Sequence, residues 1–285
     1  MIHILLNSIA LDPNRWTADK RAYFQLDQLL DPVAKAGFRF IEVWQDHVSR
    51  AAESEIKKYG KIANSLGLRF PVIGMYPSLH LRGRGRQDEL DRIKRLLNYA
   101  KLLESGLLKA FVGVQGSAQI TDSEYQRSVE FMQETLELAA SYNLAVTGET
   151  HPDTLFDSVD SCREFMKAVN LENFMVCFQP FDFYDTEKAI GDYRMLADDV
   201  VHIHYQGQKN GKMALLKDSD LDYGKLTAAL VEGGFSGKIC IEFVKDCVVQ
   251  DPKDFNVKKV LENAVQDRDF VVNVLKEAGT VDFIY

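Results

Sequence analysis

Leu144-Ala-Val-Thr-Gly-Glu149 is a short apolar run that ends on a carboxylate, and three later segments follow the same pattern. Phe174–Gln179 ends on an amide, Val200–His204 on an imidazole, and Lys238–Glu242 on a second carboxylate. Burying such a group at a strand end costs several kcal/mol unless it finds a strong partner. One divalent cation would partner all four groups, so we predict a metal site with the ligands Glu149, Gln179, His204 and Glu242.

Short β-type runs alternate with longer helical stripes along the chain. The runs start roughly 25 to 40 residues apart, which is the length of a strand, a helix and two loops. The helical segments carry their own signals, such as the capping box Thr121-Asp-Ser-Glu124 and the apolar stripe from Val257 to Leu275. The predicted strands are Ile2–Asn7, Arg39–Trp44, Arg69–Met75, Ala110–Val114, Leu144–Glu149, Phe174–Gln179, Val200–Tyr205 and Lys238–Val244.

Eight β-then-α units without a low-complexity linker predict an α/β fold, a (β/α)8 TIM barrel. A chain of 285 residues can form this barrel as a single domain, 1–285. The alternative is a doubly wound open sheet. That fold normally has a Gly-rich phosphate turn after its first strand, and Asn7-Ser-Ile-Ala10 is not one.

The composition is that of a soluble globular protein, with 46% hydrophobic and 27% charged residues. A formal net charge of −8 argues against nucleic acid as a partner, because phosphate backbones select basic surfaces. Four cysteines without Cys-x-x-Cys spacing indicate a reducing compartment, and two of them, Cys177 and Cys240, are expected to be small core residues. With no basic leader and no run of about 20 apolar residues, we expect a cytoplasmic protein that does not cross a membrane.

Strand periodicity predicts where the four candidate ligands point, because strand side chains alternate between the two faces of a sheet. Glu149 shares a face with Thr147, His204 shares one with His202, and in each strand the larger apolar set belongs against the helices. The polar set then faces the barrel interior near the carboxyl end, where barrel active sites lie. Apart from Lys238 at the far end of its strand, we expect no Lys or Arg on these inward faces.

Several motifs occur in an order and spacing that resemble the xylose-isomerase-like sugar isomerase/epimerase superfamily over nearly the whole chain. They lie at the expected second, fifth, seventh and eighth strands. The motifs are Gly37-Phe-Arg-Phe-Ile-Glu42, Gly148-Glu-Thr-His151, His202-Ile-His204, Leu221-Asp-Tyr223 and Gly234-Phe-Ser-Gly-Lys-Ile-Cys-Ile-Glu242.

The resemblance implies one divalent ion, Mn, Mg, Co or Zn, bound by Glu, Asp, His and Glu on strands five to eight. These positions are Glu149, Gln179, His204 and Glu242 here, so Gln179 replaces the usual Asp. An amide oxygen still binds a hard cation, but the site then carries two formal negative charges instead of three.

The resemblance also implies isomerisation or epimerisation of a small sugar or sugar-like substrate through proton transfer next to a ketose carbonyl. In that reaction Glu149 and Glu242 are the catalytic pair, one removing the proton and the other returning it. Two alternatives stay open: a metal-dependent dehydratase or lyase of a keto-cyclitol or keto acid, and a non-catalytic sugar-binding barrel. A repair endonuclease is disfavoured by the acidic charge.

Candidate substrate contacts lie at the ends of other predicted strands. Glu42 and Trp44 end the second strand on its inward face, with Glu42 either a substrate contact or an internal ion-pair partner. His151 follows the fifth strand, His80 the third, and Lys209 the seventh. His202 is expected to pack inside the barrel. A homo-oligomer, a dimer or tetramer, is an open expectation, with the tail Val281–Tyr285 packing across an interface or back on the barrel.

Overall fold

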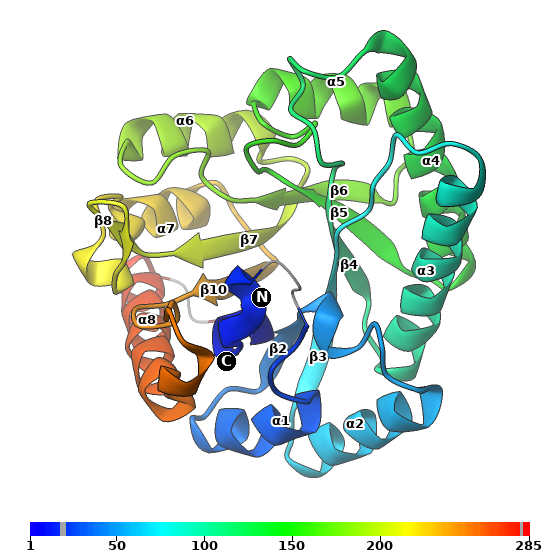
Figure 1. The fold of residues 1–285 in the computed structure, drawn as a ribbon. Helices are drawn as coiled ribbons and strands as arrows, with labels where there is room; N and C mark the ends of the chain where they lie inside the picture. Colours follow the sequence, from blue (N-terminus) through cyan, green and yellow to red (C-terminus); the bar gives the residue numbers. More distant parts are fainter. Residues whose placement is uncertain (18–20, 280–281) are drawn as a thin grey trace.

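Parallel strands close into a barrel in the computed structural model, which describes residues 1–17, 21–279 and 282–285 (Figure 1). Neighbouring strands pair in chain order, and β10 pairs with β1 in parallel, which closes the sheet. This closure confirms the predicted barrel and excludes the open doubly wound sheet. The barrel strands are β1 (Ile2–Asn7), β2 (Phe40–Val43), β3 (Arg69–Met75), β4 (Leu107–Phe111), β5 (Ala145–Glu149), β6 (Phe174–Phe178), β7 (Val200–Gln206) and β10 (Lys238–Phe243).

Helices surround the barrel as a ring (Figure 1) and bury one apolar face each against the strands. The predicted capping box starts α4, where the Thr121 hydroxyl accepts the Glu124 amide and the Glu124 carboxylate accepts the Thr121 amide. The helices are α1 (Leu26–Lys35), α2 (Glu53–Ser65), α3 (Gly83–Leu102), α4 (Asp122–Ser141), α5 (Val159–Val169), α6 (Thr186–Leu196), α7 (Tyr223–Glu232) and α8 (Val257–Glu277).

The fourth strand is where the sequence prediction was wrong. The structure places β4 at Leu107–Phe111, three residues before the predicted Ala110–Val114. Lys109 interrupts the apolar run in its middle, so the run appeared to begin after the lysine. The chain then turns at Gly113, whose φ is 85°. The other predicted strands agree with the structure to within one residue at each end.

The interior of the barrel is layered. An apolar layer of Leu5, Val72, Leu107 and Cys240 fills its middle. Two residues further toward the carboxyl ends of β1, β4 and β10 lie the buried polar side chains of Asn7, Lys109 and Glu242. The inward residues near the carboxyl ends of β5 and β7 are polar and buried as well, as the alternation predicted. The apolar layer therefore supports a polar layer that water hardly reaches.

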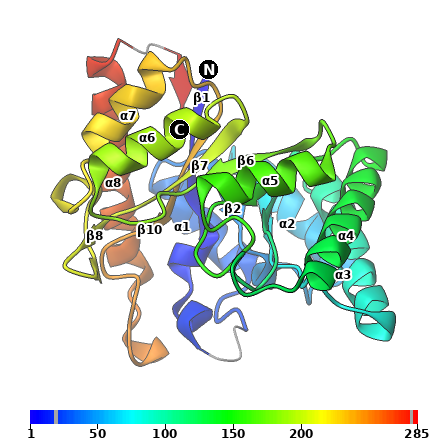
Figure 2. The same ribbon diagram turned by 90° about the horizontal axis from the view of Figure 1, so that it is seen from above.

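Loops at the carboxyl ends of the strands form the barrel mouth. In Figure 2 the loop after β10 and the loop between β1 and α1 extend from the same end of the molecule. A two-strand hairpin, β8 (Gln208–Lys209) and β9 (Lys212–Met213), follows β7. At the other end of the chain, β11 (Phe283–Ile284) pairs with β1, so this part of the tail packs back on the barrel. Val281 lies outside the described residues.

Across the described ranges, we find no helix whose length and apolarity would suit a membrane crossing.

Gly148 sets the position of the residue after it, Glu149, because its neighbours leave no space for a side chain. A Cβ on Gly148 would lie 2.4 Å from Phe156 Cε2 and 2.7 Å from Val112 Cγ2. We expect Gly148→Ala to lower the free energy of unfolding by about 1–3 kcal/mol, measured by urea denaturation. The control is Gly191→Ala in α6, where nothing lies within 4 Å. Equal stability of the two variants would show that the packing around β5 is looser than described.

Candidate active site

The predicted residues on β5, β7 and β10 converge inside the barrel. Glu149, His204 and Glu242 are buried, and each offers a ligand atom within 4.8 Å of the others. His204 Nδ1 lies 3.0 Å from Glu149 Oε1 and 3.3 Å from Glu242 Oε1. Two carboxylates thus approach one ring nitrogen of the same imidazole.

The other ring nitrogen of His204 faces a carboxylate as well. His204 Nε2 lies 3.0 Å from Glu42 Oε2, and His202 Nε2 lies 2.6 Å from the same oxygen. Glu42 also accepts a hydrogen bond from Asn7 Nδ2 at 3.0 Å. Glu42 is therefore the internal ion-pair partner, one of the two roles open to it, and His202 packs inside the barrel as expected.

Lys109 supplies a buried cation from β4, a strand that the expectation about the four ligand strands did not cover. Its Nζ lies 2.5 Å from Glu149 Oε2, and both side chains are fully buried. The ammonium also lies 4.7 Å from the Tyr76 ring centroid and 4.9 Å from that of Phe111. The misplaced fourth strand hid this lysine, because its inward direction follows only from the register of β4.

The pKa shifts in the cluster favour the charged forms of Glu42, Glu149 and Lys109. Burial alone would raise the pKa of Glu42, but the imidazoles of His204 and His202 hold it well below its usual range. Burial also opposes the charge of Glu149, yet Lys109 and then His204 lower its pKa strongly. The pKa of Lys109 is raised despite burial, chiefly by Glu149. The pKa of His202 is lowered, mainly by burial.

The residues fit a divalent cation on two observations. Gln179 follows β6, between the strands of Glu149 and His204, and its buried Oε1 has no hydrogen-bond partner among the described residues. His204 Nε2 faces Glu42, as in metal-binding histidines that donate their second N–H to a carboxylate. Three carboxylates, Glu42, Glu149 and Glu242, face a single ammonium, that of Lys109, and a divalent ion would offset this excess of acidic groups.

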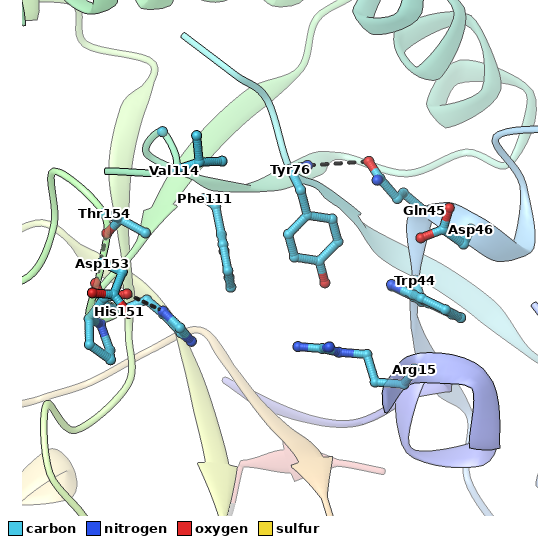
Figure 3. A pocket seen from close by; sticks show the side chains of 12 residues that line it. Arg15, Trp44, Gln45, Asp46, Tyr76, Phe111, Val114, His151, Asp153 and Thr154 are labelled. Atoms are coloured by element: carbon cyan, nitrogen blue, oxygen red, sulfur yellow. Dashed lines mark hydrogen bonds between the residues drawn. The ribbon is translucent and has the colours of Figure 1, made fainter. Parts of the chain in front are cut away.

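A pocket of about 440 Å³ lies at the mouth beside this cluster. Figure 3 shows Trp44, Tyr76 and Phe111 pointing into it, with Arg15 and His151 facing the same space. Tyr76 and Phe111 also contact Lys109, so they connect the pocket to Glu149. Burial raises the pKa of Tyr76 to about 12, so its hydroxyl stays protonated at neutral pH.

Two of the five predicted substrate contacts line the pocket, and the other three do not. Trp44 and His151 line the pocket, and His151 lies 4.4 Å from Phe111 between ring centroids. Glu42 is buried deeper, and neither His80 nor Lys209 is among the lining residues. Lys209 is an exposed residue of β8.

Sequence reasoning named Trp44 and His151 but missed the other lining residues, among them the aromatic Tyr76 and Phe111 and the basic Arg15. Tyr76 follows β3 on the inward parity of Val72 and Gly74, so the argument used for Trp44 would have found it. Phe111 becomes inward only with the corrected register of β4. Arg15 lies in a short 3-10 helix, Pro13–Trp16, and no pattern in the sequence distinguishes it.

The family model described as xylose isomerase-like TIM barrel matches residues 30–266. The chain belongs to this family. A curated 3-dehydroshikimate dehydratase of Bacillus anthracis is 24% identical over 174 residues, which cover 60% of this chain and 62% of that protein. The match thus spans less than two thirds of the relative's length.

Solved structures share the fold at low identity. A probable 3-DHS dehydratase of petrobactin synthesis from Bacillus anthracis superimposes with a TM-score of 0.71 at 18% identity, covering 91% of this chain and 97% of the other. A D-psicose 3-epimerase from Clostridium cellulolyticum H10 gives 0.74 at 20% identity, covering 96% and 99%. Enzymes of two reaction classes are therefore similar to this barrel.

The Lys109–Glu149 pair predicts a large penalty for losing one partner. With a chelator present, Lys109→Met should lower the free energy of unfolding by about 3–5 kcal/mol, because Glu149 is left charged and buried. Adding Glu149→Gln should restore part of this loss, as measured by a denaturant double-mutant cycle. The exposed Lys276→Met serves as control. Additive losses in the double variant would contradict the pairing.

Gln179→Asp should tighten manganese binding by roughly tenfold, because a carboxylate adds one negative charge to the ligand set. Isothermal titration of the protein without substrate measures this effect. Gln266→Asp, an exposed change in α8, controls for the added charge alone. If the Gln179 variant binds no more tightly than the control, Gln179 does not face the ion.

Proposed function

We propose that this chain is a divalent-metal-dependent enzyme that transfers a proton at a carbon next to a carbonyl of a small polyhydroxylated substrate. The supporting observation is the approach of Glu149 and Glu242 to one nitrogen of His204, beside an aromatic pocket. A divalent ion held by Glu149, Gln179, His204 and Glu242 would supply Lewis acidity toward the carbonyl. The ligand chemistry of these four residues supports the metal assignment.

The two carboxylates differ in their surroundings. Glu242 has one ion-pair contact among the described residues, with His204, and is slightly more exposed than Glu149. Glu149 is neutralised by Lys109, and a carboxylate beside an ammonium is a weaker base. We therefore assign removal of the proton to Glu242. In an isomerase or epimerase, Glu149 returns a proton to the carbon skeleton.

A dehydratase is the second candidate, and the Lys109–Glu149 pair favours it. Proton return by Glu149 requires that this group first be protonated, which Lys109 opposes. Elimination of water needs only one base at carbon, and the hydroxyl that departs takes a proton from an acid such as His151 at the pocket wall. The 3-dehydroshikimate dehydratase relative supports the same reading.

One incubation separates the two outcomes. Ketoses and cyclic hydroxy keto acids are incubated with the manganese-supplemented protein in deuterated water and followed by NMR. An isomerase or epimerase incorporates deuterium at the rearranged carbon, whereas a dehydratase releases water and yields an unsaturated carbonyl. If no substrate gives either product, the proposal is rejected and a non-catalytic sugar-binding barrel is favoured.

Glu242→Gln should lower turnover by roughly 100- to 10,000-fold, since the amide cannot accept the proton. The protein should stay folded, because its ion pair with His204 is one of several contacts made by that ring. Glu277→Gln, an exposed change at the end of α8, is the matched control. Near-normal turnover in the Glu242 variant would remove this residue from the mechanism.

A further inference from the structure

Arg15 is a cation directed into the pocket without an acidic partner. Figure 3 shows its guanidinium facing the space between Tyr76, Phe111 and His151. Among the described residues, no carboxylate forms an ion pair with it, whereas the nearby cations Lys109 and Arg92 are paired.

Local structure holds Arg15 in this direction. The adjacent Asp12 caps the 3-10 helix and accepts the backbone amides of Asn14, Tyr23 and Phe24. It also lies 3.2 Å from His47 Nε2, so its oxygens are already engaged. Asp12 is buried and thus fixes the helix without neutralising Arg15.

Aromatic rings position the guanidinium itself. Its Cζ lies 5.0 Å from the Trp16 ring centroid and 5.7 Å from that of Phe243. Such contacts orient the planar group but leave its N–H donors free. A guanidinium so placed matches the two oxygens of a carboxylate.

We propose that Arg15 binds a carboxylate of the substrate, so that the enzyme acts on a hydroxylated keto acid and not on a neutral ketose. This inference rests on the proposed function and narrows its substrate class. The reacting carbon lies toward Glu149 and Glu242, and the carboxylate lies toward Arg15 on the β1 side of the mouth. The aromatic walls between them strengthen the ion pair by excluding water.

The charge of the pocket favours a carboxylate over a phosphate. Arg15 is the single Lys or Arg among the described residues that line it, and Asp153 lines it too. A phosphate monoester carries close to two negative charges at neutral pH, so Arg15 would leave one of them unbalanced beside Asp153. A carboxylate carries one charge, which Arg15 balances.

The test compares three ligands with one carbon skeleton that differ at C6: D-fructose, D-fructuronate and D-fructose 6-phosphate. Binding to the manganese-supplemented protein is measured by isothermal titration, without reliance on turnover. We expect D-fructuronate to bind roughly tenfold or more tightly than D-fructose, with D-fructose 6-phosphate no better than D-fructose. Arg15→Gln should abolish the preference and Arg15→Lys should keep part of it. Arg95→Gln, an exposed change in α3, should leave it intact.

Four results of this titration would be incompatible with a carboxylate bound to Arg15. Equal binding of D-fructose and D-fructuronate, absence of D-fructuronate binding, a preference for the phosphate, or a preference that survives Arg15→Gln would overturn the carboxylate assignment. A carboxylate preference without any deuterium incorporation or water release would instead retain the Arg15 site and reject the proposed reaction. The two failures are therefore distinguishable.

Discussion

Buried charge is the constraint on which this structure depends. Glu149 and Lys109 are wholly enclosed, and each favours the charged form of the other against the cost of burial. His204 connects this pair to Glu42 through its two ring nitrogens. The barrel interior therefore holds a connected polar network. The apolar layer beneath it, around Leu5 and Cys240, contributes packing that helps to offset the cost of burying these charges.

This network also explains why one barrel suits more than one reaction. Its carboxylates and imidazole serve any chemistry that begins with proton removal next to a carbonyl. The fate of the resulting anion depends on which acid lies nearby and on what the pocket holds in place. Lys109 and Arg15 are residues that influence this later step. Neither belongs to the four strand-end residues from which the fold was predicted.

Much of the fold was predictable because strand periodicity and strand-end polarity act locally. Glu149, His204 and Glu242 could be placed together from alternation alone, since parallel strands present their carboxyl ends at one rim. Lys109 could not, because a charged residue within Leu107–Phe111 weakens the signal that defines a strand, and only the tertiary pairing with Glu149 offsets its burial. Arg15 could not be predicted as a pocket residue for a different reason. The direction of its side chain depends on Asp12 and on the ring of Phe243, which is distant in sequence.

The central claim is that these side chains surround a cation. Anomalous diffraction from crystals grown with manganese tests it most directly. The account predicts one anomalous peak within coordination distance of Glu149, Gln179, His204 and Glu242. Absence of a peak there, or a peak among Glu42, His202 and Cys240 instead, would contradict it.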